Sequence, residues 1–233
     1  METKFMIGAS LICGNQADLA SDVKQLKESN IEFLHVDTMD GKFVPRYGMY
    51  PEQVEHIRKM CDIPVNVHMM VSDPEPFIDW FAKSGATYIT VHAEANQHLG
   101  RTAAMIKNAG CKLGVAFNIH STHHIIENLI DDIDLVMLMA INPGILGQSC
   151  WPGIYKKIET FRNYLDSNGR KDVLIEIDGG VTRKTAPKMI QSGANMLTCG
   201  TGTIYRPHEG TLVEVIKGFR KYMNNELRES SEI

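Results

Sequence analysis

Residues 33–37 read FLHVD, residues 88–92 read YITVH and residues 174–178 read LIEID. In each stretch apolar residues alternate with polar ones, which is typical of a β-strand whose two faces meet different surroundings. Residues 8–10 and 65–68 keep the same alternation. One face of every strand in a closed barrel points inward, so the pattern predicts a barrel whose polar side chains converge at its mouth.

Short apolar runs alternate with longer segments of helical periodicity along the whole chain, and this order is typical of βαβ units and a parallel sheet. Even spacing and the absence of GxGxxG after the first strand favour an α/β fold of one (β/α)₈ TIM barrel over an open doubly wound sheet. We expect a single domain over residues 1–233, with a polar C-terminal tail from about residue 224. The eight expected strands, each followed by a helix, are 5–11, 33–37, 65–70, 88–92, 112–117, 135–139, 174–178 and 196–199.

Helix ends are also readable. Segments 17–28, 51–60 and 74–84 are expected helices, and the last two carry proline at or near the first helical position. Glycine closes three helices just before a strand, as left-handed caps do. These glycines are Gly85, Gly110 and Gly193.

The composition is that of a globular chain: 233 residues are 43% hydrophobic and 22% charged, with 24 Lys and Arg against 28 Asp and Glu. The resulting charge of −4 and the lack of a basic run argue against nucleic-acid and anionic-membrane partners. The chain shows neither a signal segment nor a membrane span, and we expect a cytoplasmic protein. Five scattered cysteines without CxxC indicate reduced thiols.

Four inward-facing residues at the strand ends could bind a metal. His35, Asp37, His68 and Asp178 form a two-imidazole, two-carboxylate set that suits zinc, manganese, cobalt or ferrous iron. Any one of them alone is more often a hydrogen-bonded polar side chain, but convergence from three strands favours a metal site.

Glycine-rich turns and methionines complete the predicted mouth. Turns at 142–148, 178–180 and 199–202 follow the last three strands, where barrels often bind phosphate through backbone N–H groups. Each turn alone would be an ordinary tight connection. Met39, Met70 and Met139 lie near the same strand ends and are expected to form an apolar floor.

With these motifs the chain resembles the ribulose-phosphate 3-epimerases over about residues 5–205. The resemblance is carried by HVDTMDGKFVP at 35–45, HMMV at 68–71, NPG at 142–144 with Gly147 and Gln148, and EIDGG at 176–180. It implies a ribulose-phosphate-binding type of barrel and an isomerase that epimerises a ketose phosphate at carbon 3.

The resemblance also implies the parts of the site. One divalent ion (Zn, Fe, Mn or Co) and no organic cofactor is expected. Asp37 and Asp178 are expected to act as the acid/base pair around a metal-stabilised enediolate, one removing a proton and the other delivering one to the opposite face. A small sugar phosphate is the expected partner, and a homo-oligomer, dimer or hexamer, the expected assembly. The implied metal ligands are His35, Asp37, His68 and Asp178, and the implied substrate-binding residues are Ser10, His68, Gly144, Gly147, Gly179, Gly180, Gly200 and Thr201.

Several residues depart from the family pattern near the sugar end of the site. Ile145 and Leu146 stand where Phe-Gly is usual, Lys42 replaces a histidine, Arg46 replaces an asparagine, and segment 46–50 is one residue shorter. D-ribulose 5-phosphate to D-xylulose 5-phosphate ranks first, with D-allulose 6-phosphate as the alternative substrate. A non-catalytic sugar-phosphate-binding barrel ranks lower, as does a carbon–carbon lyase, because no lysine is in phase at the strand ends. The metal, the oligomeric state and the pathway stay open.

Overall fold

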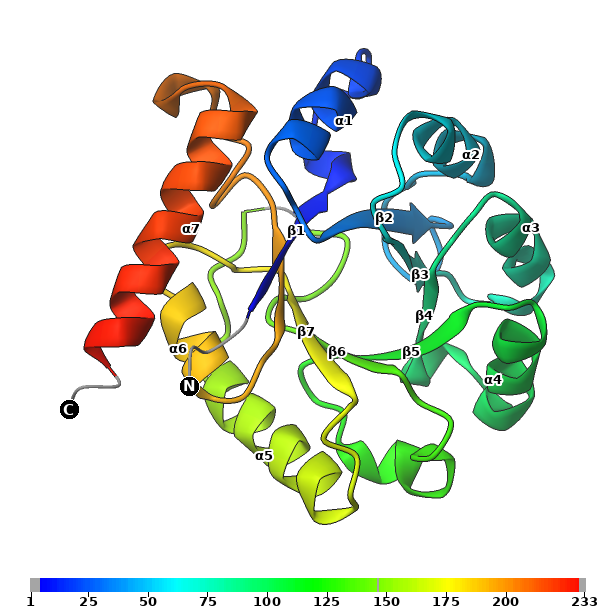
Figure 1. Ribbon diagram of the computed structural model, residues 1–233. Coiled ribbons are helices and arrows are strands. Elements are labelled where there is room, and N and C mark those ends of the chain that lie inside the picture. The colour runs from blue at the N-terminus through cyan, green and yellow to red at the C-terminus, as the bar shows by residue number, and fades with distance from the viewer. Residues whose placement is uncertain (1–4, 146, 231–233) are drawn as a thin grey trace.

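Eight parallel strands close into one barrel in the computed structural model, which describes residues 5–145 and 147–230 (Figure 1). Neighbours in the chain are neighbours in the barrel, and β8 closes it by pairing with β1 from Met6 opposite Met196. The predicted (β/α)₈ architecture is confirmed, and the open sheet is excluded. The strands are β1 (Met6–Ser10), β2 (Phe33–Met39), β3 (Val65–Met70), β4 (Tyr88–His92), β5 (Lys112–Phe117), β6 (Leu135–Met139), β7 (Leu174–Asp178) and β8 (Met196–Cys199).

Helices surround the barrel and cover the outer faces of its strands (Figure 1). Each packs through one apolar stripe, because residues three and four apart share a helix face. In the last helix this stripe includes Val215, Phe219 and Met223, all buried. The α-helices are α1 (Leu19–Glu28), α2 (Pro51–Met60), α3 (Ile78–Lys83), α4 (Leu99–Asn108), α5 (Ile154–Ser167), α6 (Ala186–Gln191) and α7 (Leu212–Glu229); 3₁₀ turns are η1 (Leu11–Cys13), η2 (Glu75–Phe77), η3 (Ala93–Ala95), η4 (His123–Leu129) and η5 (Pro207–Glu209).

Three expectations about helices need correction. The helix expected at 17–28 begins at Leu19, because the Asp18 side chain caps it by accepting a hydrogen bond from the Ser21 N–H. The connection after β5 is the 3₁₀ helix η4, in a segment of His, Ile and Asn, which are poorer helix formers than Ala or Leu. The polar tail expected from residue 224 is helical as far as Glu229, since Leu227 is buried against the barrel's outer layer.

The predicted strand phase is confirmed by burial. Leu34 and Val36 of β2 belong to the large outer core that packs under the helices. The inward face of the same strand carries Phe33, His35 and Asp37 from the bottom of the barrel to its mouth. The barrel interior is therefore apolar at one end and polar at the other.

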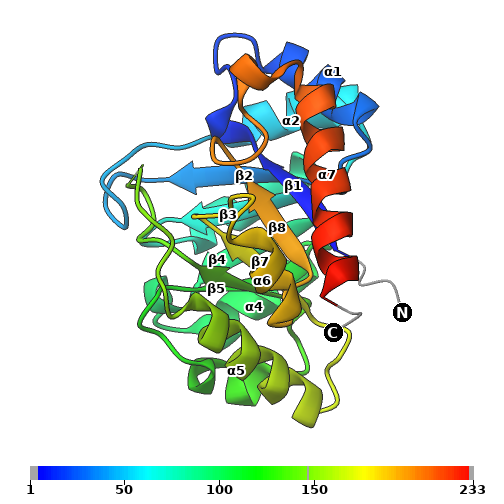
Figure 2. The same cartoon turned by 90° about the vertical axis from the view of Figure 1, so that its left-hand side faces the viewer.

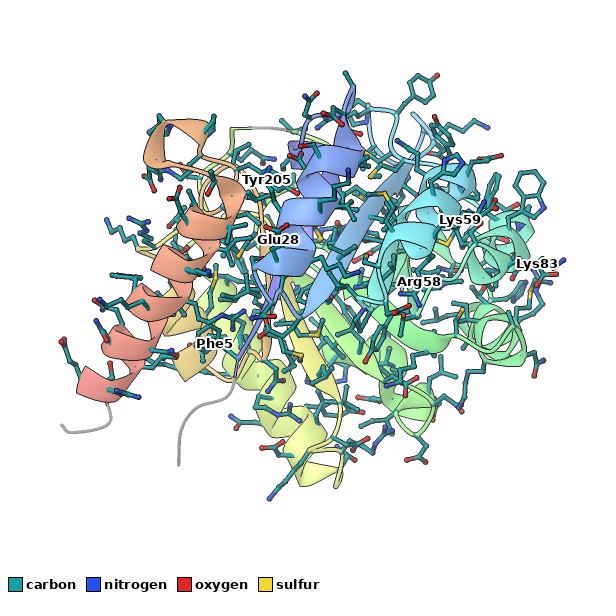
Figure 3. The ribbon with its side chains drawn as sticks, turned by 45° about the horizontal axis from the view of Figure 1, so that its top comes forward. Phe5, Glu28, Arg58, Lys59, Lys83 and Tyr205 are labelled. Carbon is teal, nitrogen blue, oxygen red and sulfur yellow. The ribbon has the colours of Figure 1, made fainter. Side chains whose placement is uncertain are left out.

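Glycine caps and cysteines behave as expected. Gly85, Gly110 and Gly193 have φ values of +100°, +83° and +112°, which is the left-handed conformation predicted for caps. All five cysteines are free thiols. Charged side chains such as Lys59 and Lys83 point outward from the helices (Figure 3). Among the described residues, no helix is long and apolar enough to cross a membrane.

Loops at the carboxyl ends of the strands form one rim of the barrel, at the left of Figure 2. The loop after β2 and the loop after β6 meet there, because Gly144 has no side chain. A Cβ at Gly144 would lie 2.5 Å from the Cβ of Val44. This rim is the end of a barrel at which active sites form.

Candidate metal and substrate site

His35, Asp37, His68 and Asp178 converge at the mouth of the barrel. The strand register sets this arrangement: Asp37 of β2 lies directly opposite His68 of β3. His35 Nε2 is 3.2 Å from Asp37 Oδ1, and His68 Nδ1 is 3.5 Å from the same oxygen and 3.4 Å from Asp178 Oδ2. One potential ligand atom of each residue lies within 4.8 Å of the others. The four residues predicted from three separate strands therefore form one cluster.

The cluster favours a positive charge at its centre. Burial by itself lowers the pKa of His35, but the carboxylates of Asp37 and Asp178 outweigh it and raise that pKa well above its usual value. Burial likewise opposes ionisation of Asp37, yet His35 and His68 hold the pKa of this carboxyl well below its usual range. The pKa of His68 is raised by hydrogen bonds to the two aspartates, against the effect of burial. Two carboxylates thus share a site that calls for a cation.

A divalent metal ion fits these donors. His35 Nδ1 pairs with Glu176, which leaves the lone pair of Nε2 facing the aspartates. Nδ1 of His68 is buried, has no hydrogen-bond partner and faces the same two carboxylates. Two imidazole nitrogens and two carboxylate oxygens are ligands of zinc, manganese, cobalt and ferrous iron. The residues present could therefore hold such an ion.

A buried hydrogen-bonded network supports His35 from below. Glu176 Oε1 lies 2.8 Å from His35 Nδ1 and accepts a hydrogen bond from the Thr198 hydroxyl at 2.5 Å. Its other oxygen accepts from the amide of Asn66 at 2.6 Å, and Thr90 donates to that amide's oxygen at 2.7 Å. All five side chains are buried. The network fixes the orientation of His35, as carboxylate partners do for metal-binding histidines.

A second histidine lies behind His68. His92 Nε2 is 2.9 Å from His68 Nε2, and His92 Nδ1 is 3.1 Å from Glu94 Oε2. Burial lowers the pKa of His92 to about 4, so its imidazole is neutral at neutral pH. Burial raises the pKa of Glu94, but hydrogen bonds from His92 and Ser121 lower it to about 2. A neutral imidazole and a carboxylate thus follow His68 in a chain.

A cavity of about 230 Å³ opens above the cluster. Asp37 and Asp178 lie at its floor with 7% and 15% of their side-chain surfaces exposed, whereas His35 and His68 are fully buried beneath. Ser10 donates to Asp37 Oδ2 at 2.9 Å. The predicted methionine floor is confirmed, since Met39, Met70 and Met139 line the cavity. The predicted substrate-binding residues that also line it are Ser10, Gly144, Gly147, Gly179, Gly180, Gly200 and Thr201.

Glycine turns form the rim on the side of β6, β7 and β8. Gly179 and Gly180 follow Asp178 with φ values of +83° and +63°, a conformation that side chains strain. A Cβ at Gly179 would also lie 2.3 Å from the Ile141 side chain. Within residues 5–145 and 147–230, the N–H groups of Gly179, Gly180 and Gly200 donate to no protein acceptor. They remain available to an anion.

The loop after β2 supplies the opposite rim. Its backbone is closed by hydrogen bonds from the Gly41 N–H to the Arg46 carbonyl and from the Arg46 N–H to the Val44 carbonyl. Arg46 is the only cationic side chain that lines the cavity among the described residues. The shortened segment then runs tightly along β2, where a Cβ at Gly48 would lie 2.3 Å from the Asp37 carbonyl oxygen. Leu146, a departure noted in the phosphate loop, lies outside the described residues.

A second cluster of possible metal ligands lies away from the barrel interior, on η4. His123, His124 and Glu127 bring one donor atom each within 4.8 Å, and His124 and Glu127 are exposed. His124 pairs with Glu127, while the His123 ring stacks on Tyr164. No donor of this cluster reaches the cavity at the mouth.

Known proteins of related sequence share the whole barrel. The profile of the Ribulose-phosphate 3 epimerase family matches residues 6–204. "Ribulose-phosphate 3-epimerase" of Bacillus subtilis (strain 168) is 39% identical over 212 residues, which cover 91% of this chain and 98% of that protein. The chloroplastic "Ribulose-5-phosphate-3-epimerase" of Arabidopsis thaliana is 35% identical over 222 residues, covering 94% of this chain and 79% of that one.

Solved structures of low sequence identity share the fold. KGPDC from Streptococcus mutans, in its sugar-phosphate complex, superposes with a TM-score of 0.73 at 14% identity and covers 95% of this chain and 98% of that one. 3-Hexulose-6-phosphate synthase from Salmonella typhimurium gives a TM-score of 0.67 at 13% identity, covering 97% and 99%. At these identities the likeness concerns the barrel alone.

A closed barrel with paired carboxylates at its mouth is typical of a (β/α)₈ enzyme, here one of the isomerase class. The sequence matches define it further: the chain belongs to the ribulose-phosphate 3-epimerase family. Sequence reasoning placed His92 and Glu176 on the inward face but gave them no role. The signal was the same alternation that identified the metal-ligand candidates, but their partners come from other strands or from beyond the strand end.

Proposed function

We propose that this protein epimerises a pentulose phosphate at carbon 3, with D-ribulose 5-phosphate and D-xylulose 5-phosphate as its substrate pair. The observation that carries the proposal is the pair of aspartates at the cavity floor. Asp37 comes from β2 and Asp178 from β7, on either side of β1 and β8 in the barrel. The sequence relatives named as ribulose-phosphate 3-epimerases support the choice of sugar.

Inversion at one carbon needs two proton-transfer groups on opposite faces of the substrate. In the proposed reaction one aspartate removes the proton next to the ketone while the other, protonated, delivers a proton to the other face. The two exchange roles when the reaction runs in reverse. Ser10, which donates to Asp37 Oδ2, holds that carboxylate in place. The histidines beneath the floor fix both aspartates, since each faces both carboxyl groups.

His35, Asp37, His68 and Asp178 would hold one divalent ion. Such an ion supplies positive charge that stabilises the negative charge developing on the sugar oxygens when the proton leaves. Met39, Met70 and Met139 would keep water from the reacting carbon, because thioether side chains offer it no strong hydrogen-bond partner.

The substrate's phosphate is assigned to the glycine rim. Free N–H groups at Gly179, Gly180 and Gly200 can donate to phosphate oxygens, and Gly144, Gly147 and Thr201 complete that side of the cavity. Arg46 lies on the opposite rim and provides a charge that complements an anionic ligand. The same residue and the tight segment after it favour testing a second substrate, D-allulose 6-phosphate, because they change the wall rather than the floor.

Exchange of the substrate proton with solvent tests the proposal directly. The purified protein, loaded in turn with Zn²⁺, Mn²⁺, Co²⁺ or Fe²⁺, is incubated in deuterium oxide with D-ribulose 5-phosphate and separately with D-allulose 6-phosphate. NMR follows the proton on carbon 3 and the epimer formed. We expect deuterium incorporation and xylulose 5-phosphate from the pentulose. Incorporation only from the hexulose would replace the substrate, and tight binding of either sugar without exchange would support a non-catalytic barrel.

A further inference from the structure

We propose that His92 and Glu94 are positioning residues that hold His68 with its Nδ1 atom free to bind the metal ion. The inference rests on the metal site of the proposed function and adds two residues that do not touch that site's ligand atoms. It starts from three side chains in a row, His68, His92 and Glu94, joined at 2.9 and 3.1 Å. The row leads away from the cavity floor.

Donor and acceptor roles along the row follow from its far end. Glu94 is a carboxylate, which only accepts hydrogen bonds, so Nδ1 of the neutral His92 must carry the proton of that bond. The Nε2 atom of His92 then has a lone pair and accepts from His68 Nε2–H. A neutral His68 protonated at Nε2 has its lone pair on Nδ1, the buried atom that faces Asp37 and Asp178. The carboxylate thus selects the tautomer of His68 through His92.

Glu94 is itself held in one orientation. Its Oε1 atom accepts from the Asn118 N–H at 2.8 Å and from the Ser121 hydroxyl. These donors, from the loop after β5, leave Oε2 for His92. Asn96 donates to the carbonyl oxygen of His92 at 2.6 Å and so fixes the backbone between the two residues. The row therefore has a fixed end, which a tautomer selector needs.

The two metal-ligand histidines are then supported in the same way at different range. His35 meets the carboxylate of Glu176 directly, and His68 meets that of Glu94 through an imidazole. Neither His92 nor Glu94 lines the cavity in which the substrate is proposed to bind. Substitutions at these two positions consequently act on the metal site and leave substrate contacts in place.

Three substitutions separate positioning from simple packing. His92→Phe fills the space without a hydrogen-bond acceptor. His92→Gln restores an acceptor oxygen for His68 Nε2–H. Glu94→Gln keeps the shape, but the donors on Asn118 and Ser121 bind its oxygen and turn its NH₂ group toward His92. That NH₂ group forces the proton of His92 onto Nε2 and reverses the row, so that His68 is protonated at Nδ1.

The readouts are the Zn²⁺ dissociation constant, from competition with a chromophoric chelator, and the His68 tautomer, from long-range ¹H–¹⁵N spectra. All proteins carry His123→Ala and His124→Ala, so that the exposed η4 cluster binds no zinc. We expect one zinc per chain in this background, with affinity lowered about 10- to 100-fold by His92→Phe and by Glu94→Gln. His92→Gln should stay closer to the unsubstituted site. In the metal-free protein, Glu94→Gln should move the His68 proton from Nε2 to Nδ1.

Unchanged zinc affinity and an unchanged His68 tautomer in both His92→Phe and Glu94→Gln would refute the positioning role while leaving the proposed function intact. A background protein that binds no zinc would overturn both. His56→Gln, at an exposed histidine on α2, is the matched control and should alter neither readout. Thermal unfolding of the metal-free variants shows whether they fold, and Glu94→Gln keeps the test open if His92→Phe does not.

Discussion

The two ends of the barrel interior are equally buried and chemically opposite. At the bottom, Phe33, Leu135 and Met196 form a small apolar cluster. At the mouth, the same inward faces carry His35 and Asp37, with other polar residues beside them. The strands are continuous between the two ends, so backbone structure does not separate them.

The difference shows how one barrel divides stability from function. Apolar side chains at the bottom gain free energy by leaving water. Buried charged groups at the mouth lose hydration and are tolerated only because they are paired, which costs stability and creates a site that attracts a cation. We therefore expect substitutions at the mouth to change catalysis and metal binding, and substitutions at the bottom to change folding.

The largest effect is expected from Asp178→Asn. The amide cannot take or deliver the proton, so kcat for the pentulose phosphate should fall by about 10³-fold or more. The free energy of unfolding should change by no more than about 1 kcal/mol, because the substitution removes a charge from a crowded anionic site. Epimerisation assays and denaturant unfolding check both values. A variant with normal turnover would remove Asp178 from the proton-transfer role.

Phe33→Ala is the counterpart at the bottom. The Phe33 ring fills the space beside Gly8, where a Cβ would lie only 2.1 Å from the ring. Its loss should leave a cavity and lower the free energy of unfolding by about 3–5 kcal/mol. The fraction that stays folded should keep kcat within about 3-fold. Phe77→Ala, at a ring 37% exposed, is the control and should cost under about 1 kcal/mol. Equal losses in both variants would contradict the comparison.

Acid should weaken the mouth through His92. Burial lowers the pKa of His92 to about 4 in the folded protein. Between pH 6.5 and 4 the unfolded chain takes up this proton and the folded chain does not, so stability falls as the pH falls. For the metal-free protein, we expect a loss of up to about 3 kcal/mol over that range, which His92→Phe lacks. Urea unfolding at several pH values measures it, and parallel pH profiles would count against it.

The smallest effect is expected at the rim. Arg46→Met removes a charge from the cavity wall without touching the aspartates, so KM for the sugar phosphate should rise about 5- to 10-fold while kcat stays within about 2-fold. Lys42→Met, in the same loop but not lining the cavity, is the matched control. Steady-state kinetics on both sugars would show whether Arg46 also sets substrate preference. Equal KM changes in the two variants would point to overall charge instead.

Local sequence patterns predicted most of the fold and the centre of the site. Alternation placed His35 and Asp37 on one face because side-chain direction in a strand depends only on residue spacing. Glycine predicted the caps at Gly85 and Gly193 for the same local reason. The helical end of the chain was missed, because polar residues at 224–229 conceal one buried contact at Leu227.

Partnerships between strands were beyond the reach of sequence patterns. Register places Asp37 opposite His68, and barrel closure brings Thr198 of β8 to Glu176 and His35. The row from His68 through His92 to Glu94 depends on distances of about 3 Å, which no residue spacing specifies. The sequence by itself determined which residues face inward, since that follows from backbone periodicity. Only the tertiary structure decided which of them meet, because hydrogen bonds between distant strands depend on how the barrel closes.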